Sequence, residues 1–286
     1  MADAKDLTRD NDIRDEPGTQ RALAGSGEEL ATLLHSDDDE VLLALLENPA
    51  LVATDVAVLL ARKNLPAAMI EEICKRREWL KPYALKKALA CHPHTPRLVS
   101  LRLLRELYLM DLVQIALLPG VSAELKRNAE DQLLTRLPQL PLGQKITLAR
   151  RGPARVAGLL LAEGHPLVVP VALDNSRLTA SQILKVLARE TVPESVVQAI
   201  AQHRKWNCDY NVRLALLRNP ATTLAVSLSF LPELTVSDLR ELAAPGIVPE
   251  RLRKYLEQET QRRIQAGEKL DAHEDSFLDG QPSKDV

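Results

Sequence analysis

The sequence contains one long internal repeat, and this repeat constrains the fold more than any other feature. Residues 60–95 align without a gap on residues 187–222 when the chain is shifted by 127 positions. The two stretches share twelve identities in 36 positions, among them Trp79 with Trp206 and Tyr83 with Tyr210. A match at a fixed offset is the signature of a repeat architecture.

The residues that fill this repeat favour helix. Hydrophobic residues make up 45% of the chain but aromatic residues only 3%, so the core has to come from Leu, Ala, Val and Ile. Leu and Ala are strong helix formers, and no alternating Val, Thr and Tyr runs indicate strands. Segments of helical length fill residues 41–264, and prolines such as Pro66, Pro153 and Pro193 stand at their starts. The chain is therefore predicted to be all-α.

Turns recur at a regular spacing along these segments. The turn residues are Asn48-Pro49, His92-Pro93, Leu137-Pro138, Asn175-Ser176 and Asn219-Pro220, with steps of 44, 45, 38 and 44 residues. Short amphipathic helices bury their apolar faces by stacking on their neighbours. The sequence predicts an α-solenoid, a right-handed superhelix of about five units of ~42 residues, and leaves open two or three helices per unit.

In period, helix length and turn placement, residues 41–263 resemble the HEAT/armadillo-like superfamily. The Asn-Pro turns are also similar to those of bacterial leucine-rich repeat variant proteins. The chain differs from that second family in its longer period and in having no clustered cysteine segment. The resemblance implies a superhelix of stacked helices with a long concave face. Because the clustered cysteines are missing, no iron–sulfur role is carried over from the second family, and no cofactor is predicted.

The charge distribution divides the chain into three parts. Residues 1–27 and 264–286 are polar and acidic and are predicted to be disordered, whereas residues 28–263 form the helical repeat domain. Residues 41–263 carry 31 basic and 21 acidic side chains, and the acidic excess lies in the two ends. Either the basic body binds an anionic partner, with the acidic tails competing for the same surface, or its basic residues form a solvated surface.

Several other classes of protein do not fit the sequence. It has no secretory signal and no apolar run long enough to cross a membrane, and its three cysteines form no disulfide framework, so a cytoplasmic protein is expected. It has no nucleophile elbow, phosphate loop or dinucleotide-binding glycine pattern, so no catalytic residues are predicted. Cys91-His92-Pro93-His94 could hold a metal, but its copy 127 residues later is the plain turn Arg218-Asn219-Pro220-Ala221, which favours a turn and no metal site.

Two sets of residues are candidates for binding because the repeat keeps them. The basic set is Arg62, Arg77, Lys86, Arg150, Arg189, Arg204 and Arg213. The aromatic set is Trp79, Tyr83, Trp206 and Tyr210. The basic residues either line a groove or cover a solvated rim. The aromatic residues either form recognition platforms or act as packing wedges between helices, and the second role is favoured.

These observations predict a non-enzymatic scaffold or adaptor that binds another protein, or an acidic peptide segment, along its concave face. The alternative is a nucleic-acid binder that uses a basic groove, as helical-repeat DNA-repair proteins do. The pI near 6.3 and the acidic ends count against that alternative.

Overall fold

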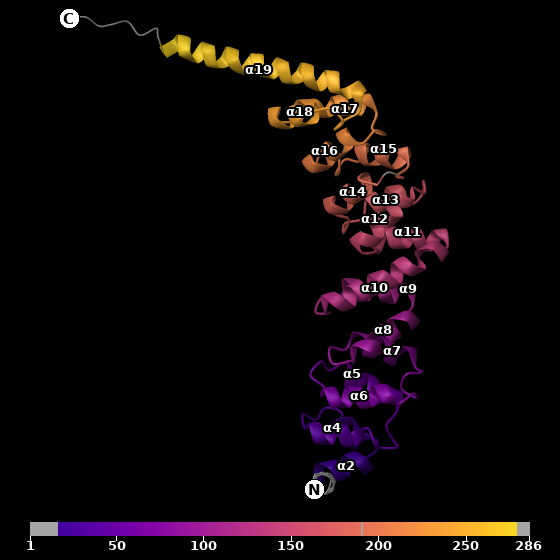
Figure 1. The fold of residues 1–286 in the computed structure, drawn as a ribbon. Helices are drawn as coiled ribbons and strands as arrows, with labels where there is room; N and C mark the ends of the chain where they lie inside the picture. The colour runs from indigo at the N-terminus through magenta and orange to yellow at the C-terminus, as the bar shows by residue number, and fades with distance from the viewer. Residues whose placement is uncertain (1–16, 190, 279–286) are drawn as a thin grey trace, which may run out of the picture. The chain divides into compact units, whose positions relative to one another are not determined.

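The computed structural model describes residues 17–189 and 191–278, and every regular element in these residues is helical (Figure 1). Eighteen α-helices and two short 3-10 helices cover this part of the chain, which contains no strand. The prediction of an all-α fold is confirmed. Internal contacts divide the chain into two compact units, which meet in the sequence between Gln139 and Leu140.

Unit 1 holds the first half of the helices. They are α2 (Pro17–Ala24), α3 (Glu28–Leu33), α4 (Asp39–Leu45), α5 (Ala53–Leu60), α6 (Ala67–Lys75), α7 (Tyr83–Cys91), α8 (Arg97–Glu106), α9 (Leu109–Leu117), α10 (Ala123–Arg136) and the 3-10 helix η1 (Leu137–Gln139). Unit 2 holds α11 (Leu142–Arg151), α12 (Ala154–Glu163), α13 (Val169–Leu173), α14 (Ala180–Leu187), α15 (Glu194–Gln202), α16 (Tyr210–Arg218), α17 (Leu224–Phe230), η2 (Leu231–Glu233), α18 (Val236–Leu242) and α19 (Glu250–Leu278).

The two units are copies of one helical module. Helices α5, α6 and α7 begin and end 127 positions before α14, α15 and α16, and α10 begins 127 positions before α19. Helices α2 to α10 thus correspond in order to α11 to α19. The duplication recognised in residues 60–95 extends through the whole of each unit, well beyond the stretch in which sequence identity is dense.

Packing within each unit follows the order of the chain. Each helix contacts the next helix or the next but one, as α4 does with α6, α5 with α7, and α12 with α14. The core between them is aliphatic, and Leu45, Ile70, Leu104 and Ile200 are almost fully buried. Burying such side chains is the main stabilising contribution of this packing.

Prolines set where many of these short helices begin. Pro66, Pro82, Pro96, Pro153 and Pro193 each stand directly before the first residue of a helix. Proline has no N–H to lose at such a position, and its ring restricts φ to a value that suits the chain entering the helix. The predicted placement of prolines at helix starts is confirmed for Pro66, Pro153 and Pro193.

Helices of the described structure extend past both predicted boundaries of the helical domain. Helix α2 lies inside residues 1–27, for which disorder was predicted, and Thr19 and Ala22 are buried there. Helix α2 packs on α4, so a tertiary contact holds a segment whose own pattern is weak. At the other end α19 continues past residue 263 to Leu278. Residues 1–16 and 279–286, the remainder of the predicted acidic tails, lie outside the described residues.

The length and composition of the helices bear on membrane insertion. Among residues 17–189 and 191–278, no helix is both long enough and apolar enough to cross a membrane. The longest helix, α19, carries many charged side chains along its length.

Candidate binding cleft and repeated polar contacts

Side chains that donate hydrogen bonds to helix C-termini are the main polar contacts between helices. The last carbonyl groups of a helix have no partner within the helix, and short helices have many of them in proportion to their length. Here a donor 23 to 33 residues further along the chain supplies the hydrogen bond. These donors are Asn48, Arg62, Arg76, His92, Arg136, Asn175, Trp206, Asn219, Arg251 and Arg263.

The two copies share the most buried of these contacts. The Asn48 amide donates to the carbonyl oxygens of Ala22 (2.7 Å) and Gly25 (2.8 Å), at the end of α2. Asn175 lies 127 residues later and donates to Ala149 (2.7 Å) and Gly152 (3.1 Å). The turn asparagines identified in the sequence therefore connect separate helices, a role that their local pattern does not reveal.

Arg136 and Arg263 are a second shared pair, and the sequence analysis did not select them. Arg136 donates to the carbonyl oxygens of Leu107 (2.7 Å) and Arg105 (2.7 Å). Arg263 donates to the oxygens of Leu234 and Leu231 in the same way. A cation at a helix C-terminus also interacts favourably with the helix dipole. These two arginines could have been found from the sequence by applying the same shift of 127 positions outside residues 60–95.

Tyr83 and Tyr210 make equivalent contacts with carboxylates. The Tyr83 hydroxyl donates to Asp111 and accepts from the N–H of Tyr108 (2.8 Å), and its ring stacks on that of Tyr108. Tyr210 donates to Asp238 and accepts from the N–H of Thr235 (3.2 Å). Burial and the hydrogen bond to Asp111 raise the pKa of Tyr83 to about 12.

The indole rings of Trp79 and Trp206 belong to the cores of their units. Their exposed fractions are 7% and 3%. The Arg76 guanidinium lies 4.8 Å from the Trp79 ring centroid, and the Lys205 amine lies 4.1 Å from that of Trp206. This burial agrees with the packing role that the sequence analysis favoured and leaves neither ring open as a recognition platform.

Three of the predicted basic residues are used within the fold. Arg62 donates to the carbonyl oxygens of Leu34 (3.0 Å) and Ser36 (2.7 Å) and pairs with Asp37. Lys86 pairs with Glu106 at 2.6 Å. Its counterpart Arg213 is buried, lies over Phe230, and bonds to Glu233 and to the carbonyl oxygen of Asn207. These three are not free to line a groove.

The other four basic residues are exposed. They are Arg77, Arg150, Arg189 and Arg204. Among the described residues no hydrogen bond or ion pair involves their side chains. Arg77 and Arg204 occupy equivalent positions, each shortly after the helix that precedes a buried tryptophan. The repeat thus keeps this pair of arginines without giving them a contact in the fold.

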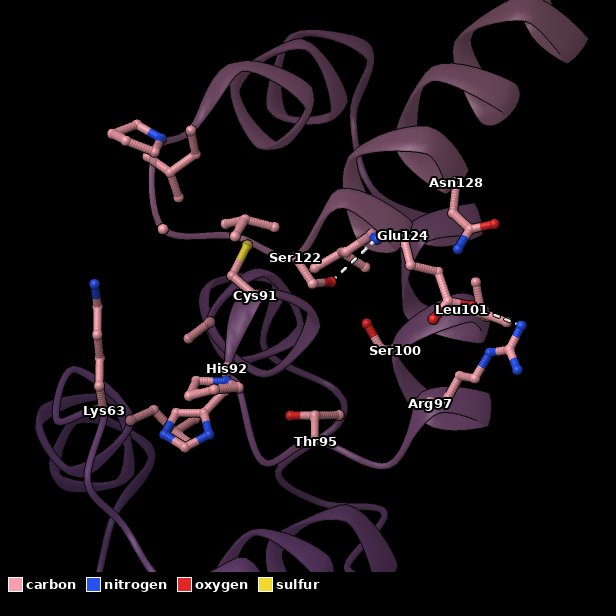
Figure 2. Close-up of a pocket in the computed structure, with 18 of the residues that line it drawn as sticks. Lys63, Cys91, His92, Thr95, Arg97, Ser100, Leu101, Ser122, Glu124 and Asn128 are labelled. Carbon is pink, nitrogen blue, oxygen red and sulfur yellow. Dashed lines mark hydrogen bonds and ion pairs between the residues drawn. The ribbon is translucent and has the colours of Figure 1, made fainter.

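A cleft of about 740 Å³ lies in unit 1, between the end of α7, the start of α8 and the α9–α10 connection (Figure 2). Its apolar walls include Leu60, Leu101, Leu118, Val121 and Leu125. Its charged lining residues are Lys63, Arg97 and Glu124. Figure 2 shows Lys63 on one side of the cleft and Arg97 and Glu124 on the other, where these two form an ion pair of 2.6 Å.

Cys91 and His92 line this cleft, and burial affects the chemistry of both. Burial raises the pKa of the Cys91 thiol and lowers the pKa of His92. Nδ1 of His92 accepts from the N–H of His94 (3.3 Å), so the proton is on Nε2, which donates to the carbonyl oxygen of Arg62 (2.9 Å). Neither ring nitrogen is available as a base. Within the described residues, no three His, Cys, Asp or Glu side chains are grouped as a metal site.

Comparison with known proteins adds no relative. Protein-family models, curated proteins and solved structures were all searched, and none matches this chain.

Proposed function

We propose that this chain is a non-enzymatic scaffold or adaptor that binds a protein partner through exposed arginines placed at equivalent positions in its two units. Arg77 and Arg204 carry this proposal. They are the same residue type at one repeat position, and both are exposed. Neither side chain takes part in a hydrogen bond or ion pair among the described residues. Arginine is enriched at protein interfaces and recognises carboxylates through two parallel hydrogen bonds. Acidic side chains of a partner protein are the chemistry that fits each of these arginines.

Charge reversal tests the proposal. The doubly substituted variant Arg77→Glu with Arg204→Glu is compared with the unaltered chain in co-purification from native lysate, read by mass spectrometry. We expect the partner captured by the unaltered chain to be lost, because like charges replace attraction at both positions. The free energy of unfolding should change by less than about 0.5 kcal/mol, because exposed residues without contacts add little to stability.

The matched control makes the same change in net charge at two other positions. Arg102 and Arg240 are exposed, lie one in each unit, take part in no described hydrogen bond or ion pair and are not equivalent across the repeat. Arg102→Glu with Arg240→Glu should retain the partner. If the Arg77 and Arg204 variant captures the partner as well as this control does, the proposal is wrong.

The architecture that we propose for this role is a HEAT/armadillo-like α-solenoid. Its support is that each helix packs on near neighbours in the chain, with alternate helices in contact. Contacts between alternate helices favour an array that is two helices thick. The predicted repeat unit of about 42 residues would contain three of these short helices. Solution scattering tests the idea. A compact domain of 286 residues has a radius of gyration of about 19 Å, and a solenoid should clearly exceed it.

Binding of nucleic acid is the second candidate, and the basic excess of residues 41–263 favours it. Several of those cations, however, are hydrogen-bonded to helix carbonyl groups, among them Arg62, Arg136 and Arg263. A guanidinium held in this way contributes little to phosphate binding. A salt-dependent mobility shift of arbitrary duplex DNA would support this candidate, and no shift at low salt would exclude it.

A further inference from the structure

Residues that line the cleft of unit 1 have counterparts in unit 2, where an arginine is hydrogen-bonded to two of them. Pro93, Thr95 and Glu124 line the cleft, and the residues 127 positions later are Pro220, Thr222 and Arg251. Arg251 stands near the start of α19, and its guanidinium donates to the carbonyl oxygens of Pro220 (2.9 Å) and Thr222 (2.9 Å). The fold of unit 2 thus supplies its own cation to these two acceptors.

Unit 1 keeps the acceptors but has no donor for them. Glu124 replaces the arginine, and a carboxylate cannot donate to a carbonyl group. Among the described residues, no hydrogen bond reaches the carbonyl oxygens of Pro93 and Thr95. Glu124 turns instead to Arg97, in an ion pair whose side chains are 53% and 74% exposed. Such an exposed pair contributes little and is readily exchanged.

We propose that the unit 1 cleft is a receptor for an arginine side chain on a peptide segment of a partner protein. The guanidinium takes the position that Arg251 occupies in unit 2 and donates to the carbonyl oxygens of Pro93 and Thr95. Glu124 provides the counter-charge that the arginine of unit 2 lacks. The inference builds on the proposed protein-binding function and names the chemistry of a second contact with the partner.

The charges around the cleft permit a cation in it. Burial lowers the pKa of His92, so this ring is neutral at neutral pH. The two cations in the lining, Lys63 and Arg97, have side chains open to solvent, where water screens their repulsion. Glu124 stands at the position of Arg251, whose guanidinium makes the equivalent contacts in unit 2, so a carboxylate stands at the repeat position from which that arginine reaches the two acceptors. The size also fits, because binding pockets of about 300–1,000 Å³ are typical and this one measures about 740 Å³.

Three short peptides test the proposal directly on the full chain. They are acetyl-Gly-Arg-Gly-amide and the same peptide with lysine or with citrulline, the uncharged analogue of arginine. Isotope-edited NMR follows the backbone amides of Thr95, Arg97 and Gly120. The arginine peptide should give saturable shifts at these amides. The citrulline peptide should bind at least about tenfold more weakly, because charge-assisted hydrogen bonds are roughly twice as strong as neutral ones. The lysine peptide should also bind more weakly, since an ammonium lacks the forked geometry.

Two variants use one unit as the control for the other. Glu124→Arg gives unit 1 the same residue as Arg251 in unit 2. The protein should stay folded, because unit 2 folds with arginine at this position. The arginine peptide should no longer shift these amides, because the new side chain would bind the two acceptors. Arg251→Glu combined with Leu224→Arg rebuilds the unit 1 arrangement in unit 2. It should create a second set of saturable shifts around Thr222.

Three results would overturn the inference. They are the absence of saturable shifts with the arginine peptide, equal binding of the citrulline peptide, and unchanged binding by the folded Glu124→Arg variant. These results are separate from the test of the proposed function. Loss of the partner with the Arg77 and Arg204 variant would still support protein binding if the arginine peptide failed. Binding of the peptide would still support the cleft if that variant kept its partner.

Discussion

Replacement of Asn48 by alanine tests whether polar contacts between residues far apart in the sequence stabilise each unit internally. The Asn48 side chain is 5% exposed, and its amide donates to two carbonyl oxygens at the end of α2. Its Oδ1 also accepts from the N–H of Ala50 at 2.8 Å. Alanine removes all three hydrogen bonds. It leaves the carbonyl groups of the buried Ala22 and Gly25 without this donor, and it removes the acceptor for the N–H of the exposed Ala50.

The expected cost follows from these three bonds. A typical hydrogen bond contributes about 0.5–1.5 kcal/mol net, so Asn48→Ala should lower the free energy of unfolding of unit 1 by about 3 kcal/mol. That is a large share of the roughly 5–15 kcal/mol by which a domain is stable. Asn48→Asp should cost more, because it keeps the size of the side chain but places a carboxylate against two carbonyl oxygens. Asn175→Ala removes the same three contacts from unit 2 and should cost unit 2 a similar amount.

Each unit contains one tryptophan, so fluorescence can follow them separately. In a Trp206→Phe background only Trp79 reports, and urea unfolding of unit 1 is read from it. Asn64→Ala is the matched control, because Asn64 is exposed and has no described hydrogen bond. The reasoning is refuted if Asn48→Ala destabilises unit 1 by no more than Asn64→Ala does.

Three further predictions concern tyrosine, acid and thiol chemistry. Tyr83→Phe removes the hydrogen bonds with Asp111 and with a backbone N–H, and urea unfolding should show a loss of about 1–2 kcal/mol. Burial alone would raise the pKa of Asp111, but hydrogen bonds from Lys87 and Tyr83 outweigh it and lower that pKa. Its contribution is therefore present above about pH 4 and lost as pH falls through the lowered pKa, so Asp111→Asn should flatten the loss of stability below pH 4. Iodoacetamide, followed by peptide mapping, should modify the exposed Cys208 well before Cys91, whose pKa burial raises, and equal rates would contradict this.

The helical class and many helix positions could be predicted because they depend on local signals. Leu- and Ala-rich segments form helices by propensity, and prolines such as Pro66 and Pro193 mark their starts. Helix α2 could not be predicted in this way. Its own pattern is weak, and it is held by α4 and by the Asn48 amide, which lies 23 to 26 residues away in the sequence.

The candidate site shows a similar division. The repeat correctly selected positions that both copies keep, but it could not say why they are kept. Arg62 and Arg77 look alike in the sequence, yet the first donates to carbonyl oxygens of another helix and the second has no described contact. The cleft was not predicted, because Glu124 and Arg251 lie outside the compared residues 60–95 and 187–222.

The duplication therefore separates three kinds of position that a single copy would leave mixed. Residues kept in both units and bonded within the fold, such as Asn48 and Asn175, are explained by stability. Arg77 and Arg204 are kept in both units and have no such bond among the described residues, which is why the proposed contact with a partner is placed on them. Glu124 differs from its counterpart and leaves two acceptors open in one unit only. Two units whose helices correspond thus differ in charge at this position, and that difference is the basis of the arginine receptor proposed for unit 1.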